Sequence, residues 1–347
     1  MKKVCVNTSA SYDVFIGPGL LQEAGKLLKP VCNSNRLVIV TDDIVDGLFG
    51  EMLKKALEKE NFSVLKYAIP QGEKSKNISV LEKLLNFLAE NDVRRNDAVL
   101  ALGGGVIGDL AGFAAAVYLR GVAVVQIPTT LLAMADSAVG GKTGIDLPAG
   151  KNLAGAFHQP KLVIADTETL GTLPRSQLAA GMGEVIKYGV IGKNRILDRV
   201  GQSDLEDLIA ACIRMKADIV EQDEADFLGV REVLNAGHTV GHAIEKLSGY
   251  TVPHGKAVAM GLVTEARMAV DLGIADVAVY ERIFSAVKSC GLFEKLPYPA
   301  SEFAQAMQSD KKNRDKGIAF ILPQEIGKYV RQELTVQQVT ELLEKQR

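Results

Sequence analysis

The 347-residue sequence contains no tryptophan, few cysteines and almost no net charge, at −2. Its cysteines, Cys5, Cys32, Cys212 and Cys290, lie far apart and form no CxxC pair, which argues for reduced thiols in a cytoplasmic protein. The near-neutral charge creates no global basic field, so we expect neither a nucleic-acid partner nor a membrane partner. No charge-free stretch reaches membrane-spanning length, and no apolar segment of signal-peptide length follows the N-terminal lysines.

The hydrophobic pattern divides the chain into two halves. In the first half, apolar runs rich in β-branched residues (36–43, 62–70, 97–102 and 122–130) alternate with segments of helical spacing (47–60 and 77–91). This alternation is typical of a parallel sheet with helices on both faces. After about residue 175 helical spacing dominates. We predict an α/β nucleotide-binding domain over 1–174 with a mostly parallel sheet, an all-α C-terminal domain over 175–347, and a cleft between them.

A glycine-rich turn is the clearest motif of the first half. Gly103, Gly105 and Gly108 match G-x-G-x-x-G between a predicted strand and a predicted helix, where glycine lets the backbone approach a pyrophosphate. The dinucleotide fingerprint is incomplete, because it also expects an acid about twenty residues later. A plain tight turn therefore fits equally well. The acids of 41–43, which end the first strong strand, could supply a contact to a ribose hydroxyl.

The segment 136–157 has neither helical nor strand periodicity, and we predict a functional loop. It is rich in glycine and carries Asp136, Lys142, Lys151 and Asn152, a combination that suits anionic ligands. The alternative is a solvated surface loop. A Walker A site is excluded, because Asp136 stands where the phosphate-binding loop needs its first glycine.

Three of the four histidines, His238, His242 and His254, lie close together in the second half. The four-residue spacing of His238 and His242 puts both rings on one face of a helix, so spacing alone predicts that they chelate a metal together. Thr239 stands where H-E-x-x-H peptidases need glutamate, which argues against that class. Glu184 is a further donor, with Lys187 one helical turn later. Hydrogen-bonded core histidines are the alternative reading.

Six ordered motifs resemble those of the 3-dehydroquinate synthase family, over nearly the whole chain from about residue 12. They occupy 103–121, 128–160, 179–189, 231–245, 254–261 and 310–317. Gly183 departs from the pattern, since the family commonly has alanine there. The resemblance implies an N-terminal domain that binds NAD, a helical domain that binds the metal and the substrate, and a homodimer. It implies zinc, with cobalt as the alternative, held by Glu184, His238 and His254, with His242 in the active site but not a ligand.

The resemblance also implies the remaining site residues. NAD would contact Asp42, Gln71, Gly72, Glu73, Lys74, Ser75, Lys76, Gly105, Val106, Ile107, Gly108, Asp109, Thr129, Thr130, Lys142, Lys151, Thr169, Leu170, Gly171 and Thr172. The substrate would contact Asp136, Lys142, Asn152, Lys187, Lys216, Arg231, Asn235, His242, and either Lys311 or Lys312, of which we choose Lys312. Arg120 would reach the substrate phosphate of the neighbouring subunit.

The implied reaction is the shikimate-pathway step from 3-deoxy-D-arabino-heptulosonate 7-phosphate to 3-dehydroquinate and phosphate. It would proceed by transient oxidation with NAD, phosphate elimination, reduction, ring opening and intramolecular aldol closure, with His242 moving a proton. One alternative is a related sugar-phosphate cyclase whose substrate lacks the carboxylate that Lys216, Arg231 and Asn235 would hold here. A second is a metal-dependent alcohol dehydrogenase of the glycerol dehydrogenase type. A third, a nucleotide-sensing binding module, would not need so many cations and metal donors.

Overall fold

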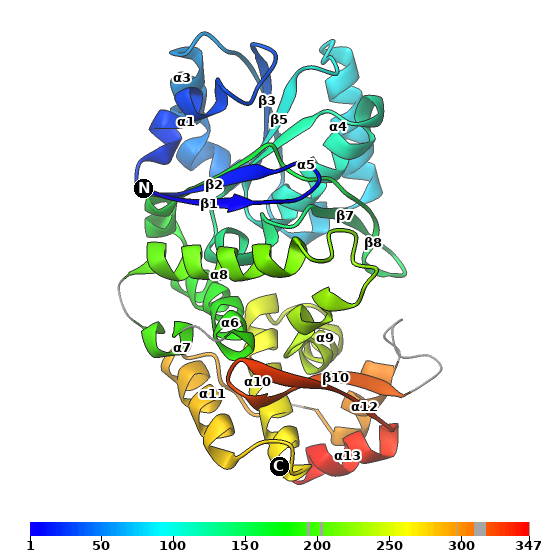
Figure 1. Cartoon of the computed structure of the whole chain (residues 1–347). Helices are drawn as coiled ribbons and strands as arrows, with labels where there is room; N and C mark the ends of the chain where they lie inside the picture. The colour runs from blue at the N-terminus through cyan, green and yellow to red at the C-terminus, as the bar shows by residue number, and fades with distance from the viewer. Residues whose placement is uncertain (193–194, 202–203, 297, 309–316, 347) are drawn as a thin grey trace. The chain divides into compact units, whose positions relative to one another are not determined.

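The computed structural model describes residues 1–347 except 193–194, 202–203, 297, 309–316 and 347. The chain divides into two compact units (Figure 1). The first consists of Met1–Leu173 and Lys216–Ala225, and the second of Pro174–Met215 and Asp226–Arg347. The segment Lys216–Ala225 thus joins the first unit, although it lies beyond residue 174. Within the described residues, no helix is long and apolar enough to cross a membrane.

Two carboxylates hold the segment Lys216–Ala225 in the first unit. Glu221 Oε1 accepts a hydrogen bond from the backbone N–H of Asn7 at 2.9 Å. Glu224 accepts from the backbone N–H of Ser9 at 2.9 Å and from the side chain of Gln159 at 3.1 Å. The N-terminal hairpin therefore depends on residues from far along the chain.

The first unit is built on a seven-stranded sheet with the order β1-β2-β9-β6-β5-β3-β4. The strands are β1 (Lys2–Val6), β2 (Tyr12–Gly17), β3 (Arg36–Asp42), β4 (Ser63–Ile69), β5 (Ala98–Gly103), β6 (Ala123–Pro128) and β9 (Leu162–Asp166). All neighbours pair in parallel except β1 with β2. This sheet confirms the predicted fold class of the first half.

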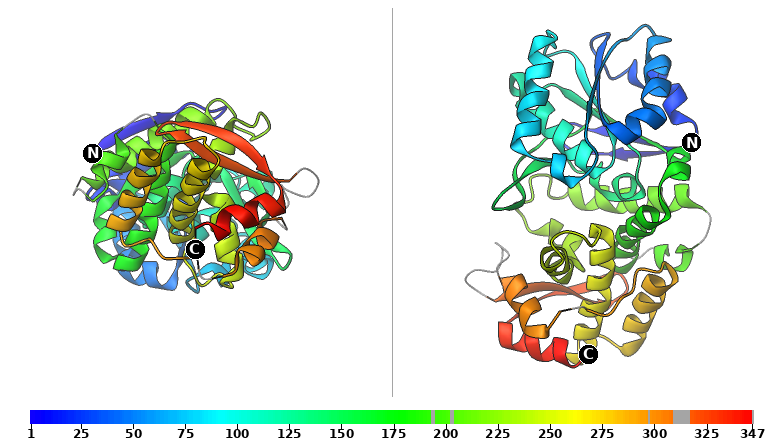
Figure 2. Two further views of the ribbon diagram at one scale, coloured as in Figure 1. Left: turned by 90° about the horizontal axis from the view of Figure 1, so that it is seen from below. Right: turned by 180° about the vertical axis from the view of Figure 1, so that it is seen from behind.

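Helices cover both faces of this sheet because successive strand residues alternate between the faces. Leu37 and Ile39 of β3 pack with α1 (Leu20–Leu28) and α3 (Glu51–Glu58). Val38 and Val40 pack on the other face with α4 (Ile78–Glu90) and α5 (Gly105–Val117). In the right view of Figure 2, the blue helices α1 and α3 and the cyan helix α4 lie on opposite sides of the strands.

The strand order reverses at β3. This strand pairs with β4 on one side and with β5 on the other, although α4 links β4 to β5 along the chain. In open α/β sheets, such a switch point leaves a crevice at the carboxyl ends of the two strands, where ligands bind. Asp42 ends β3 and Gly103 ends β5, so the structure places both sequence motifs at this point.

The segment expected to be a loop folds as a hairpin of β7 (Lys142–Leu147) and β8 (Gly150–Phe157), so the expectation of a loop is wrong there. Its strands lack an apolar alternation because Gly144 and Gly155 face each other across the pair. A Cβ atom on Gly155 would lie 2.1 Å from the carbonyl oxygen of Thr143. The short helical segments of this unit are α2 (Asp43–Val45), η1 (Asp46–Gly50), η2 (Glu73–Ser75), η3 (Tyr118–Arg120), η4 (Ala133–Ser137) and η5 (Thr167–Thr172).

The second unit is mostly helical, as predicted, but it is not all-α. Its helices are α6 (Arg175–Ile191), α7 (Ile196–Arg199), η6 (Val230–Asn235), α9 (His238–Leu247), α10 (His254–Asp271), α11 (Val277–Ser289), α12 (Ala300–Gln308), α13 (Val336–Glu344) and most of α8 (Leu205–Val220). An antiparallel hairpin of β10 (Ile318–Glu325) and β11 (Lys328–Leu334) corrects the prediction. Phe320 of β10 packs into a core with Val240, Met268 and Phe303, so the hairpin completes the helical core.

Candidate active site

Glycines let three helices of the second unit approach one another very closely. A Cβ atom on Gly255 of α10 would lie 1.9 Å from the carbonyl oxygen of Ala180 on α6. A Cβ atom on Gly183 of α6 would lie 1.9 Å from the carbonyl oxygen of Gly255. Likewise, a Cβ atom on Gly261 of α10 would lie 2.0 Å from the carbonyl oxygen of Gly237, just before α9. A side chain at any of these positions would separate the helices.

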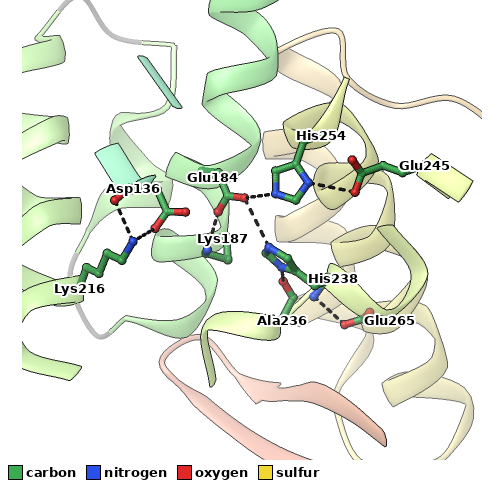
Figure 3. A network of polar contacts seen from close by, with 10 residues as sticks. Asp136, Glu184, Lys187, Lys216, Ala236, His238, Glu245, His254 and Glu265 are labelled. Carbon is green, nitrogen blue, oxygen red and sulfur yellow. Dashed lines mark hydrogen bonds and ion pairs between the residues drawn. The ribbon is translucent and has the colours of Figure 1, made fainter. Parts of the chain in front are cut away.

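This close packing brings Glu184, His238 and His254 together (Figure 3). Glu184 lies on α6, while His238 and His254 are the first residues of α9 and α10. Glu184 Oε1 lies 3.6 Å from His238 Nε2 and 3.2 Å from His254 Nε2. One donor atom from each residue lies within 4.8 Å of the others.

The second nitrogen of each ring has its own partner, which sets the direction of the ring. His238 Nδ1 lies 3.1 Å from the carbonyl oxygen of Ala236, and His254 Nδ1 lies 3.0 Å from Glu245 Oε2. These acceptors place a proton on each Nδ1 and leave both Nε2 atoms directed at Glu184. Glu245 was not among the residues predicted from the sequence, because a buried acid on a helix carries no spacing signal of its own.

The carboxylate of Glu184 attracts positive charge to the cluster. Glu184 is fully buried, and its Oε2 lies 2.5 Å from Lys187 Nζ. Burial lowers the pKa of His238 to about 3, so this ring is neutral. Burial also lowers the pKa of His254, but hydrogen bonds to Glu184 and Glu245 outweigh this effect and raise it to about 10. His254 therefore carries a proton that a metal ion can replace.

The donor set fits a catalytic zinc ion. Two imidazole nitrogens and one carboxylate oxygen are a known ligand set of such sites, and cobalt accepts the same donors. His238 and His254 each have a hydrogen-bonded Nδ1, which is the usual arrangement of a metal-ligating histidine. The residues that the family resemblance implies as ligands thus form one cluster in this unit.

His242 lies one turn after His238 on α9 and is exposed. Its ring centroid is 5.4 Å from that of His238 and 6.2 Å from that of His254. Among the described residues, a second donor group joins His242 to Glu245 and His254, but neither group contains both His238 and His242. The donor geometry therefore does not favour the joint chelate expected from spacing alone, because the His238 Nε2 is directed toward Glu184 on another helix.

The segments expected to contact NAD all follow carboxyl ends of parallel strands in the first unit. Asp42 ends β3, 71–76 follows β4, 105–109 follows β5, 129–130 follows β6 and 169–172 follows β9. Asp42 Oδ1 also accepts from the backbone N–H groups of Ile44 and Val45 at 3.1 and 2.9 Å, which caps the short helix α2. Burial raises the pKa of Asp42.

The glycine-rich turn brings α5 close to the sheet. A Cβ atom on Gly103 would lie 2.6 Å from the Ile107 side chain, and one on Gly108 would lie 2.8 Å from Gln126 Oε1 of β6. Gly104 is the N-cap residue of α5 and has no side chain, so it makes no capping hydrogen bond to the first N–H groups of the helix. Such a helix start suits a phosphate.

A buried lysine joins three of the predicted segments. Lys76 Nζ lies 2.5 Å from Asp109 Oδ2 at the start of α5, and 2.5 Å from Asn152 Oδ1 on β8. Burial raises the pKa of Asp109, and the ammonium group of Lys76 opposes this effect. The backbone N–H of Asn152 also donates to Asp146 at 2.8 Å. Candidate NAD residues and a candidate substrate residue therefore form one network.

The other substrate candidates fall into both units. In the first, Lys216 Nζ lies 2.7 Å from Asp136 Oδ1 and 2.8 Å from its carbonyl oxygen (Figure 3). Lys151 Nζ lies 3.5 Å from Glu73 Oε1. Lys142 begins β7 and is exposed, and Arg120 is exposed at the end of η3 with a φ of +63°. In the second unit, Arg231 is buried in η6, where Asn235 is the last residue. Lys311 and Lys312 lie outside the described residues.

Comparisons with known proteins give consistent results. The family model of the 3-dehydroquinate synthase N-terminal region matches residues 66–180, and that of the C-terminal region matches 181–313. The 3-dehydroquinate synthase of Citrifermentans bemidjiense is 44% identical over 337 residues, which cover 94% of this chain and 93% of that protein.

Two solved structures share the fold along nearly the whole chain. A 2-deoxy-scyllo-inosose synthase complexed with carbaglucose-6-phosphate, NAD+ and Co2+ has a TM-score of 0.90 at 23% identity, with 99% of both chains covered. ValA, a 2-epi-5-epi-valiolone synthase from Streptomyces hygroscopicus subsp. jinggangensis 5008 with NAD+ and Zn2+ bound, has a TM-score of 0.88 at 25% identity, with 100% of both chains covered.

Proposed function

Because this chain belongs to the 3-dehydroquinate synthase family, we propose that it is an NAD- and metal-dependent lyase with the family's activity. It converts 3-deoxy-D-arabino-heptulosonate 7-phosphate to 3-dehydroquinate and phosphate, a step of the shikimate pathway toward chorismate and the aromatic amino acids. The observation that carries the proposal is the convergence of Glu184, His238 and His254 on one point of the second unit.

In this proposal Glu184, His238 and His254 hold a divalent metal ion, zinc or alternatively cobalt. When bound, NAD supplies reversible hydride transfer and the metal supplies Lewis acidity toward substrate oxygens. Two structural relatives were solved with NAD+ and either Co2+ or Zn2+ bound, which supports this pair of cofactors. The domain roles follow: residues 1–174 bind NAD, and 175–347 bind the metal and the substrate.

The NAD contacts are proposed at the strand ends of the first unit. Asp42 lies at the switch point with the turn 105–109, where the uncapped start of α5 would receive the pyrophosphate. The segments 71–76, 129–130 and 169–172, together with Lys142 and Lys151, complete the proposed contacts. Lys76 would keep the Asp109 carboxylate in place beside them.

In this proposal, different cationic residues bind the phosphate and the carboxylate of the substrate. Lys142, Asn152, Arg120 and Lys312 hold the phosphate, and Lys187, Lys216 and Arg231 hold the carboxylate and nearby hydroxyl groups. Asp136 keeps Lys216 in place through a 2.7 Å ion pair, and Asn235 donates to or accepts from substrate hydroxyls. Burial of Lys187 and Arg231 makes them suited to recognise a charged group away from bulk water.

His242 is the proposed proton carrier. It is exposed and lies one turn from a metal ligand on the same helix, so it can take a proton from or give one to a substrate hydroxyl. Replacing His242 with alanine should lower turnover by about 10²-fold or more, while metal content stays unchanged. Metal analysis of the purified variant checks this, and a loss of metal would show that His242 is a ligand.

A homodimer is proposed, with Arg120 reaching the substrate of the neighbouring subunit. Two apolar residues close to Arg120 in sequence, Val117 and Leu119, are 42% and 47% exposed, as expected near a subunit contact. If Arg120 acts across the dimer, mixing inactive Arg120→Ala and His242→Ala variants should restore up to about a quarter of the activity, from mixed dimers with one intact site. No recovery after subunit exchange would refute the arrangement.

A phosphate-release assay tests the function itself. Release from 3-deoxy-D-arabino-heptulosonate 7-phosphate should require both NAD and a divalent metal, and a chelator should abolish it. The glycerol dehydrogenase alternative predicts instead that NADH accumulates steadily with polyols. The cyclase alternative predicts turnover of sugar phosphates that lack the carboxylate. Absence of phosphate release with both cofactors present would overturn the assignment.

A further inference from the structure

The helix that carries His238 and His242 begins without a capping side chain. Its N-cap is Gly237, in the left-handed region with a φ of +77°. The first backbone N–H groups of a helix have no partners within the helix, and serine, threonine, aspartate or asparagine usually supplies one. None of these fits here, because a Cβ atom on Gly237 would lie 2.7 Å from both the Leu262 side chain and the carbonyl oxygen of Val258.

Glu265 of α10 supplies the missing cap from a neighbouring helix (Figure 3). Its Oε2 accepts from the backbone N–H of Gly237 at 2.7 Å, and its Oε1 accepts from that of Val240 at 3.3 Å. The nearby backbone N–H of Thr239 also lowers the pKa of this carboxyl group. Both oxygens are therefore used at the first turn of α9.

The burial of Glu265 argues that its acceptor oxygens are needed. Only 1% of the residue is exposed. Burial raises its pKa, and the neighbouring backbone N–H groups lower it. Because an apolar side chain of similar length could be buried at lower cost, packing alone does not explain an acid at this position.

We propose that Glu265 is a positioning residue for the metal centre, acting through the first turn of α9. By fixing this turn, it sets the place of the His238 ring, whose Nε2 faces Glu184 at 3.6 Å, and of His242 one turn later. Glu265 touches neither the metal nor the substrate in this role. The inference rests on the proposed metal site, but not on the identity of the substrate.

Titration of chelator-stripped protein with Co2+, followed by the visible absorption of the bound ion, tests the proposal. Glu265→Met keeps the length of the side chain and removes both acceptors, so it should weaken Co2+ binding by about 10- to 100-fold and change the absorption band. Glu265→Gln keeps one acceptor oxygen and should give a smaller loss. If Glu265→Met does not fold by circular dichroism, the Gln variant alone decides the question.

Thr264→Val is the matched control on the same helix. Thr264 is 5% exposed and, among the described residues, its hydroxyl donates within α10 to the carbonyl oxygen of Met260 at 3.0 Å. This variant should keep the parent's Co2+ affinity and spectrum. Parental affinity in both Glu265 variants, or an equal loss in Thr264→Val, would overturn the positioning role. Failure of the parent protein itself to bind Co2+ would instead refute the metal site on which the proposal rests.

Discussion

Replacing Gly255 with alanine adds a single methyl group at the point where α10 meets α6. The new Cβ atom would lie 1.9 Å from the carbonyl oxygen of Ala180 and 2.8 Å from its carbonyl carbon. Neither atom belongs to a flexible side chain, so the two helix backbones must separate. His254 precedes the substituted residue, and Glu184 lies one turn after Ala180, so the separation acts directly on two proposed ligands.

The size of the effect follows from these distances. The oxygen must withdraw by about 1.5 Å to reach ordinary contact, which costs about 1–3 kcal/mol of stability for an overpacked site. A metal site tolerates ligand displacements of only about 0.2 Å. The variant should therefore bind zinc at least about 10-fold more weakly, since the proposed ligands can no longer reach one ion together.

The assay measures the zinc affinity and the melting temperature of both the parent and the variant. Gly47→Ala is the control, because Gly47 lies in a helical segment with no atom within 4 Å of its Cβ position and no positive φ. The control should keep the parental zinc affinity, with a melting temperature equal to or slightly above that of the parent. A Gly255→Ala variant with parental zinc affinity would refute the reasoning that close helix packing sets the ligand geometry.

Three further outcomes are expected. Apo protein should release about one proton per Zn2+ near pH 7, because the pKa of His254 is raised to about 10 and that of His238 is lowered to about 3. Zinc affinity should therefore fall as the pH falls below 10. Calorimetry in buffers of different ionisation enthalpy counts the released protons, and a count of zero or two would contradict this charge assignment. Lys76→Met should weaken NAD binding by roughly tenfold, as measured by calorimetry, because Asp109 loses its ammonium partner; unchanged affinity would exclude this lysine from the cofactor site. Asp166→Ala should lower the free energy of unfolding by about 3 kcal/mol or more, because the Asp166 carboxylate accepts hydrogen bonds from three backbone N–H groups at the starts of α1 and η5. A denaturant titration with an unchanged midpoint would contradict this.

The parallel sheet could be predicted from sequence, because its buried strands are continuous apolar runs such as Val38–Val40 and Val99–Ala101. The hairpin of β7 and β8 could not, because Gly144 and Gly155 replace the side chains whose alternation marks a strand. The hairpin of β10 and β11 was also missed, since a short apolar run such as 318–322 does not distinguish a strand from a buried helix.

Sequence reasoning found every donor of the proposed metal cluster, but spacing alone grouped His238 with His242, whereas the structure groups His238 with Glu184 and His254. The ring directions depend on the carbonyl oxygen of Ala236 and the carboxylate of Glu245, and neither contact is encoded in the interval between His238 and His242. The family resemblance separated their roles, and the donor geometry agrees with it. Local periodicity indicates which face of a helix a histidine occupies, but not which nitrogen of its ring is directed toward a metal.

The return of Lys216–Ala225 to the first unit makes that unit discontinuous in sequence. A fragment ending at residue 174 would lose the carboxylates of Glu221 and Glu224, which hold the segment between β1 and β2, although β2 would still pair with β9. It would also lose the ammonium group beside Asp136. During synthesis, the first unit can be completed only after some fifty residues beyond residue 174 have been added. An exchange of halves with a relative at a single junction would therefore also replace part of the first unit, the segment Lys216–Ala225.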